Sequence, residues 1–228
     1  MHAKNIIAAL VVFSIPATGM ASCMSDGGIS SDGTEYANMV LGGEGGGNWA
    51  ATNGDSTATG AFQFMYGTLQ DLGYISGNSR PVGSDLYGDS DWSDVTWTGL
   101  DGVNSREEFM NNQAVQVTAL GRFTQNNLDQ IGADYTSSAN GVPLTPGGVA
   151  YASHFLGAGG YQQWSSCGYQ ASCLPSNILA QNANLGGMEG INDMLMGRLA
   201  EGAGVDPSCI DPGSFDGDIP FAALMPWI

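Results

Sequence analysis

The residues best suited to chemistry lie between positions 44 and 74. A single carboxylate, Glu44, follows a short apolar run and the pair Gly42-Gly43. A loop rich in Gly, Asn, Ser and Thr comes next, followed by the compact segment G-A-F-Q-F-M at residues 60–65. A carboxyl group that is held protonated serves as a general acid, which transfers a proton to a leaving group. Glu44 is therefore the first candidate for catalysis.

A short helix has to position Glu44. Tyr36 and Val40 fall on one face at helical spacing, and Gly42-Gly43 predicts the end of this helix because glycine tolerates the left-handed turn there. Unpaired carbonyls at a helix C-terminus and a partly apolar cleft both disfavour the charged form of a carboxylate. The alternative is a solvent-exposed glutamate at a helix end, which is where most glutamates lie.

Residues 58–70 predict a second apolar helical face. Phe62, Met65 and Leu69 recur at helical spacing in this segment. Gln63 lies beside this face and is polar. It is either exposed to solvent, or it donates a hydrogen bond to a ligand or orients the nearby carboxylate.

A long helix follows an acidic insertion. Residues 76–104 are acidic, glycine-rich and irregular, and we interpret them as an insertion along a cleft edge, partly packed because of their large aromatic residues. Ser105 and Glu108 form a capping box. They predict a helix over residues 106–131 that packs behind the site.

Two more helices are expected in the second half. Thr145-Pro146 is a helix start signal for residues 147–156, and the glycines at 157–160 predict where that helix stops. His154 lies on it, and a lone histidine there is either a structural residue or a catalyst. Residues 187–201 predict an amphipathic helix with an apolar stripe of Met188, Ile191, Leu195 and Leu199.

Composition limits the classes of partner. The chain has 228 residues, with 22 acidic and five basic side chains. This length supports one good-sized core, and the acidic surface repels nucleic acid and anionic lipid. We expect no metal or cofactor, because the two histidines are too few for a metal cluster and no cysteine has zinc-like spacing.

The N-terminus predicts export. In residues 1–22, a basic start, an apolar run and small residues near a cleavage point are typical of a signal peptide, and residues 23–33 are typical of a flexible leader. Cys23 lies in a segment that resembles a bacterial lipoprotein box. The four cysteines allow three pairings, and the short spacing of Cys167 and Cys173 favours that pair. Cys23 is either lipidated or paired with Cys209.

Three motifs resemble the soluble lytic transglycosylase and lysozyme-like superfamily, in its phage- or secretion-associated form. A glutamate stands at a helix end, the segment G-A-F-Q-F-M-Y-G-T at residues 60–68 follows about twenty residues later, and residues 149–160 resemble the family's third motif. This chain has Gly45 where members usually have Ser, and Tyr66 where Pro is common. His154 stands near the position of the family's usual Tyr, so Tyr151 and His154 both remain candidates for that role.

The resemblance implies a mainly α, lysozyme-like domain over residues 34–165. Residues 166–228 are then a small disulfide-containing C-terminal extension. The substrate would be peptidoglycan, cut at the β-1,4 bond between N-acetylmuramic acid and N-acetylglucosamine. Glu44 would act as both acid and base and leave a 1,6-anhydro end. Gln63 and the backbone around Phe64 and Met65 would bind the glycan.

Alternatives to this activity stay open. Tyr151 or His154 would hold the sugar or orient the catalytic carboxylate. Asp55 is the nearest candidate for a base that activates water, which would make the protein a lysozyme- or chitinase-like hydrolase. A non-catalytic wall-binding or assembly protein is the third possibility. The protein would work in the periplasm, or on a membrane through Cys23, and its partner would be a secretion or conjugation apparatus or a phage particle.

Overall fold

The computed structural model describes residues 32–44, 46–53, 56–79, 81 and 91–207. The predictions for the signal peptide, for Cys23, Cys209 and Asp55, and for Gly45 fall outside this part of the chain.

The described chain is mainly helical, as the sequence predicts, and its few strands form two short antiparallel pairs, β1 with β2 and β3 with β4. In chain order the elements are α1 (Asp32–Glu44), α2 (Tyr66–Asp71), β1 (Ile75–Ser76), β2 (Thr96–Trp97), η1 (Leu100–Gly102), α3 (Arg106–Met110), α4 (Gln113–Ile131), β3 (Ser138–Ala139), β4 (Val142–Pro143), α5 (Pro146–Ser166), η2 (Ala171–Cys173), α6 (Ser176–Gln181), η3 (Ala183–Leu185), α7 (Gly187–Glu201) and η4 (Gly202–Gly204).

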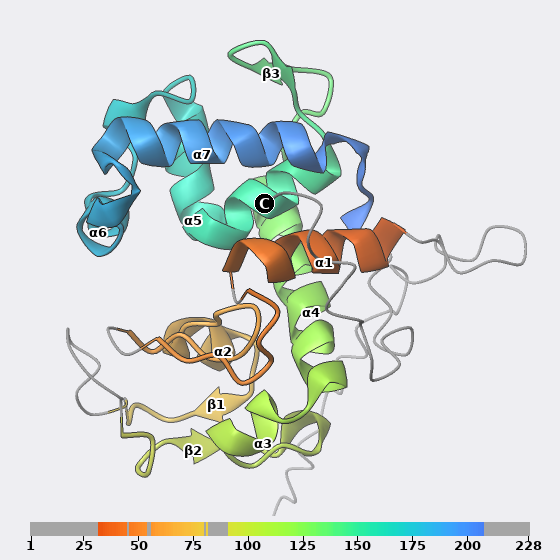
Figure 1. The fold of residues 1–228 in the computed structure, drawn as a ribbon, viewed down its shortest axis with the longest axis vertical. Helices are drawn as coiled ribbons and strands as arrows, with labels where there is room; N and C mark the ends of the chain where they lie inside the picture. Colours follow the sequence, from red (N-terminus) through yellow and green to blue (C-terminus); the bar gives the residue numbers. More distant parts are fainter. Residues whose placement is uncertain (1–31, 45, 54–55, 80, 82–90, 208–228) are drawn as a thin grey trace, which may run out of the picture.

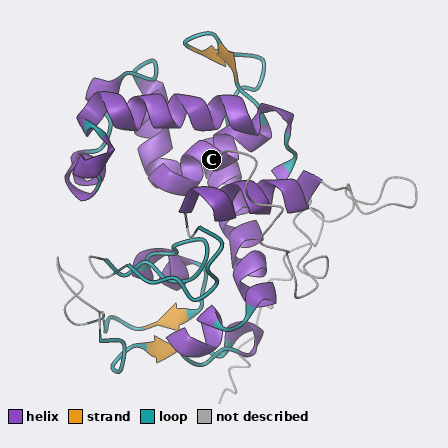
Figure 2. Ribbon diagram, in the orientation of Figure 1, coloured by secondary structure: helices purple, strands orange, loops and turns teal. Residues whose placement is uncertain are grey.

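Helix α4 connects two parts of the molecule. In Figure 1 it runs from the lower part, which holds α2, α3 and the β1–β2 pair, to the upper part, which holds α1, α5, α6 and α7. Figure 2 shows many loop segments in the lower part, while the upper part is mostly helical and carries the β3–β4 pair at its top. Helix α5 packs against both α4 and α7, so the upper part is one layered helical unit.

Each part has its own apolar core. The lower core contains the buried rings of Phe62, Phe64, Tyr74 and Phe109, and side chains of α1 join it. The upper core is centred on Trp164 and includes residues of both α5 and α7, among them Ile191, Leu195 and Leu199. The predicted C-terminal extension therefore shares a core with α5.

Helix α1 differs from its prediction at both ends. It begins at Asp32, so the last two residues of the predicted leader are helical, and it runs through Gly42 and Gly43 to Glu44. The predicted end at these glycines was wrong by one or two residues. Gly43 has a different role, because a Cβ there would overlap the hydroxyl of Tyr151 on α5. It allows α1 and α5 to approach closely, and Glu44 is the last helical residue.

The predicted helix over 106–131 is two helices. Ser105 caps α3, and its hydroxyl accepts from the Glu108 amide at 3.1 Å, as predicted. Asn112 then starts α4 anew, with its side chain accepting from the Val115 amide at 3.1 Å. A side chain that caps from inside an apolar pattern competes with the continuous helix, and the pattern alone does not reveal this break.

The apolar pattern over 58–70 is only partly helical. Thr59 and Phe64 form an antiparallel β-bridge, in which the amide of each residue donates to the carbonyl of the other at 3.0 Å. Gln63, which lies between them in the chain, adopts a positive φ of 52°. The helix α2 starts only at Tyr66. Phe62 and Phe64 are both buried in the lower core, so tertiary packing rather than a helical face explains the spacing.

The start of α5 and the extent of α7 are confirmed. The Thr145 hydroxyl accepts from the Gly148 amide at 3.1 Å, and α7 spans the predicted residues. Gly157 takes a non-helical conformation (φ 67°, ψ 167°), but the chain resumes a helix and continues to Ser166, so the predicted stop is a kink. Met188 was wrongly placed in the apolar stripe of α7, because it is 47% exposed.

The partial packing of the insertion and the disulfide agree with their predictions. Trp92 and Trp97 of the 76–104 insertion pack against the lower core. Cys167 and Cys173 form a disulfide that fastens the end of α5 to the turn before α6. Among the described helices, none is long and apolar enough to span a membrane.

Candidate active site between the two parts

A cleft of about 510 Å³ lies between the lower and upper parts. One wall comes from residues 62–72, the back comes from α4, and the other wall comes from residues 154–159 of α5 with Asn177 and Ile178 of α6. None of the described residues of the 76–104 insertion lines it. The prediction that this insertion follows the cleft edge is therefore not supported by the described residues.

The cleft lining is polar but almost uncharged. Amide side chains dominate the polar groups: Gln63, Asn126, Asn127, Gln130 and Asn177. Four phenylalanines supply apolar surface: Phe62, Phe64, Phe123 and Phe155. Amides both donate and accept hydrogen bonds, and aromatic rings provide flat apolar contact. Such a wall suits an uncharged ligand that carries many hydroxyl or amide groups.

Glu44 lies where α1 ends and the chain crosses from the upper to the lower part (Figure 1). Its Oε1 pairs with Nη2 of Arg198, from α7, at 2.7 Å. The two side chains are 17% and 7% exposed. Oε1 of Glu44 and Nη1 of Arg198 have no hydrogen-bond partner among the described residues, so the contact is an ion pair without hydrogen-bond alignment. Glu44 is outside the cleft lining itself.

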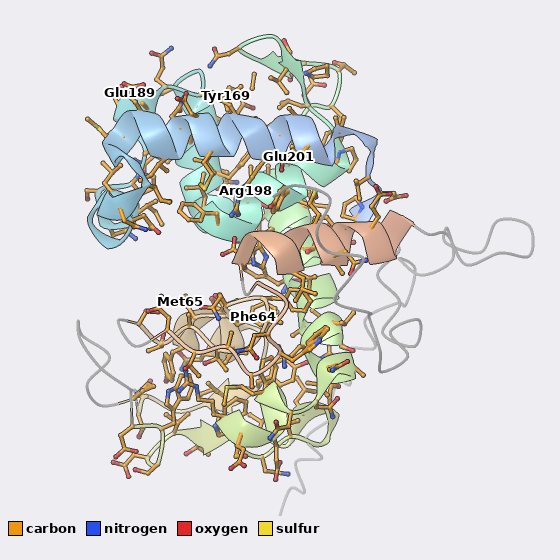
Figure 3. All side chains as sticks on the ribbon, in the orientation of Figure 1. Phe64, Met65, Tyr169, Glu189, Arg198 and Glu201 are labelled. Atoms are coloured by element: carbon orange, nitrogen blue, oxygen red, sulfur yellow. A yellow bond between two sulfur atoms is a disulfide. The ribbon has the colours of Figure 1, made fainter. Side chains whose placement is uncertain are left out.

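Arg198 links Glu44 to the cleft. Its guanidinium carbon lies 4.6 Å from the ring centre of Tyr151 and 5.2 Å from that of Phe155, which lines the cleft. Figure 3 shows Arg198 on α7 and the labelled Phe64 and Met65 across from it, in the lower part. We expected Glu44 to lie in partly apolar surroundings. The structure corrects this, because the guanidinium of Arg198 lies directly beside the carboxyl group.

Tyr151 packs beside this ion pair without forming a strong hydrogen bond to it. Its hydroxyl donates to the Met39 carbonyl at a long 3.4 Å. Burial raises the pKa of Tyr151, and the charge of Arg198 acts in the opposite direction. The phenol therefore stays neutral and contacts Arg198 through its ring face.

His154 lies in the cleft wall, in contact with two aromatic rings. Its Nε2 donates to the Phe62 carbonyl at 3.0 Å, since a carbonyl only accepts. Its Nδ1 is buried and has no partner among the described residues. The rings of Phe64 and Phe123 surround it in edge-on geometry. Burial lowers the pKa of His154, and Glu44 opposes the shift. The ring is therefore neutral, and its Nδ1 is an acceptor without a partner among the described residues.

His154 should make stability depend on pH. With its folded-state pKa below the ordinary value of 6.5, the unfolded chain binds the proton first as pH falls. The contribution to the free energy of unfolding is complete above about pH 6.5 and is lost progressively below it. Urea unfolding at pH 7 and pH 5 should show a smaller pH dependence for His154→Gln than for the wild type. Equal pH dependence in the two proteins would contradict this assignment.

Three other predicted site residues, Gln63, Phe64 and Met65, also line the cleft. The Nε2 of Gln63 donates to the Gly60 carbonyl at 2.8 Å, which holds the side chain against its own turn. Its positive φ is a strained conformation for a residue with a Cβ, and strain of this kind clusters at functional sites. Met65 is 39% exposed. The backbone of this segment, rather than its pattern, sets how these residues face the cleft.

Gln116, on α4, holds the segment in place and was missed by sequence reasoning. The side chain is fully buried. Its Oε1 accepts from the Ala61 amide at 2.8 Å, and its Nε2 donates to the carbonyls of Trp49, Phe109 and Met110 at 2.9–3.2 Å. One side chain thus ties the loop before the cleft wall to the α3–α4 junction.

Arg198 was also missed, although the sequence carried a signal. Arg198 stands three residues after Leu195 and next to Leu199, on the apolar stripe of a confirmed helix. A cation on a buried face needs a paired anion, and Glu44 is that anion. The sequence indicates the need for a partner, but only the fold identifies it.

Close contact of glycines fixes the end of α7 on the start of α5. A Cβ at Gly148 would overlap the Leu199 carbonyl, and a Cβ at Gly202 would overlap the backbone of Gly147 and Gly148. Leu199 directly follows Arg198. This packing therefore sets where the guanidinium lies relative to Glu44.

Gly148→Ala should separate these helices. The added methyl meets backbone atoms that cannot rotate away, so we expect a loss of about 2 kcal/mol in the free energy of unfolding. Gly197→Ala on α7 is the matched control, because nothing lies within 4 Å of a Cβ there. Removing a helical glycine at that position should stabilise by about 0.5–1 kcal/mol. Urea titration of both variants measures the difference. If Gly148→Ala left the free energy of unfolding unchanged, the two helices would have shifted enough to accommodate the methyl group.

The described residues contain no group of three or more His, Cys, Asp or Glu side chains placed to hold a metal ion. Comparison with protein-family models, curated proteins and solved structures finds no match to this chain.

Proposed function

We propose that this protein is a peptidoglycan lytic transglycosylase with a lysozyme-like fold, and that Glu44 is its acid and base. The observation that carries the proposal is a glutamate at the end of α1 whose ion-pair partner, Arg198, contacts Phe155 in the wall of a cleft between two parts of the molecule. The amide-rich, aromatic and nearly uncharged lining supports a glycan ligand, because sugars present hydroxyl and acetamido groups without strong charge.

The proposed reaction needs one carboxyl group. Protonated Glu44 gives its proton to the glycosidic oxygen as the bond from this oxygen to the sugar C1 breaks, through an oxocarbenium-like state. The oxygen of the sugar's own 6-hydroxyl then bonds to C1, and Glu44 takes the hydroxyl proton. No water is consumed, and the new end is a 1,6-anhydro ring. Glu44 returns to its protonated form, ready for another cycle.

Residues of the cleft wall would hold the glycan in this reaction. His154 would contact the glycan as part of the cleft wall, although its Nδ1 is buried and does not face the cleft opening. Gln63 and the adjacent Phe64 and Met65 would bind the opposite side of the strand. Tyr151 would act indirectly, because it contacts Arg198 rather than the cleft.

Hydrolysis is the second candidate, and one observation favours it. Asp71, at the end of α2, is an exposed carboxylate in the cleft lining. A second carboxylate that activates water would make the enzyme lysozyme- or chitinase-like. Asp55 was the residue predicted for this role, and it lies outside the described part of the chain. Asp71 is the candidate base that the structure adds.

Product masses separate the two reactions. Purified peptidoglycan is incubated with the mature protein, and the soluble fragments are analysed by mass spectrometry. We expect fragments with 1,6-anhydro ends. Fragments heavier by one water would instead assign hydrolysis, and Asp71→Asn would then abolish them. A folded protein that releases no fragments would contradict both enzymatic candidates and favour wall binding or assembly.

We propose the periplasm as the place of action, with Cys23 as an optional lipid anchor. The disulfide between Cys167 and Cys173 is compatible with export, since such bonds persist in oxidising compartments. A partner would be a secretion or conjugation apparatus or a phage particle, for which the enzyme opens the wall locally.

A further inference from the structure

We infer that Arg198 is the positioning residue of the active site: it holds Oε1 of Glu44, so that the other carboxylate oxygen carries the transferred proton. The inference rests on the proposed function and assigns different tasks to the two oxygens. The ion pair engages Oε1 at 2.7 Å. Oε1 is also buried against the guanidinium, so the other carboxylate oxygen is the one left to exchange a proton with a substrate.

The cost of burying Arg198 argues that its position matters. Arg198 is only 6% exposed, and removing a guanidinium from water is expensive unless an anion and further contacts offset the loss. Two aromatic rings, those of Tyr151 and Phe155, clamp its planar group. The glycine contacts between α7 and α5 fix its backbone. A flexible surface arginine has none of these restraints.

The groups around the pair leave Arg198 as the counter-charge of Glu44. Tyr36 from α1 and Tyr151 from α5 both have raised pKa values because of burial, so both phenols are neutral. His154 from α5 has a lowered pKa for the same reason. Glu201, one turn from Arg198 on α7, is exposed. As Glu44 gives up its proton, Arg198 stabilises the carboxylate that forms.

Kinetics of Arg198→Met and Arg198→Lys test the inference. Initial rates are measured on soluble, uncrosslinked glycan strands. We expect kcat to fall about 10²-fold in Arg198→Met with KM nearly unchanged, because an ångström of misplacement costs about that much and substrate contacts remain. Arg198→Lys keeps the charge and should recover about tenfold. Arg122→Met removes a cation from a surface ion pair with Asp101 and is the matched control.

A double-mutant cycle makes the result independent of activity. The free energies of unfolding of Glu44→Gln, Arg198→Met and the double variant report whether the two side chains are coupled. Coupling together with the kcat loss supports the inference. Coupling with kcat unchanged in Arg198→Met overturns it and leaves the proposed function intact. A wild-type protein that releases no glycan products overturns the proposed function and the inference together, even if coupling is found.

Discussion

Glu44→Gln should lower the rate of glycan cleavage by about 10²–10⁴-fold, the range that a positioned general acid contributes. Glutamine has nearly the same shape as glutamate but cannot give a proton to the glycosidic oxygen. Its amide oxygen can still face Arg198, so we expect the variant to fold. The rate is measured from the release of soluble fragments from peptidoglycan, and folding is checked by circular dichroism.

The matched control for this variant is Glu35→Gln. Glu35 lies on the same helix and is exposed, so its loss should leave the rate within about twofold. If Glu44→Gln kept full activity, the carboxyl group would have no part in the chemistry, and both the transglycosylase and the hydrolase candidates would be wrong. A wall-binding or assembly role would then account for the fold and its cleft.

Gln116→Leu should reduce the free energy of unfolding by about 4 kcal/mol, the largest stability loss that we expect from one substitution here. Leucine fills a similar volume but neither donates nor accepts. The Ala61 amide and the carbonyls of Trp49 and Met110 would lose this buried partner, while the Phe109 carbonyl keeps a bond from the Asn112 amide at 3.2 Å. Each buried polar group left without a partner costs about 1–3 kcal/mol. Urea unfolding followed by tryptophan fluorescence measures the loss.

The control for this substitution is Gln125→Leu on the same helix. Gln125 is exposed and, among the described residues, donates to Asp129 at 2.7 Å, so the expected change is within about 0.5 kcal/mol. Gln116→Leu should also weaken activity in the folded state, because Gln116 holds the segment that forms one cleft wall. A loss of less than about 1 kcal/mol would show that water or a shifted backbone replaces these hydrogen bonds.

Local features of this chain were predictable from its sequence. The caps at Ser105 and Thr145 and the extent of α7 depend on residues within one turn of each other. The disulfide between Cys167 and Cys173 closes a short loop. Spacing and residue type predict interactions over such short separations, because the helical period and the capping geometry are the same in every protein. Glu44 at the end of a helix belongs to the same class.

Contacts between distant residues were decided by the tertiary structure. Gln116 reaches an amide 55 residues away, Arg198 reaches Glu44 from the last long helix, and Gly43 accommodates the hydroxyl of Tyr151. Nothing within a few residues of these positions specifies their partners, because packing of whole elements brings them together. The sequence by itself determined which residue types are available for chemistry. The fold determined that a carboxylate, a buried guanidinium and an amide-lined cleft lie at one junction.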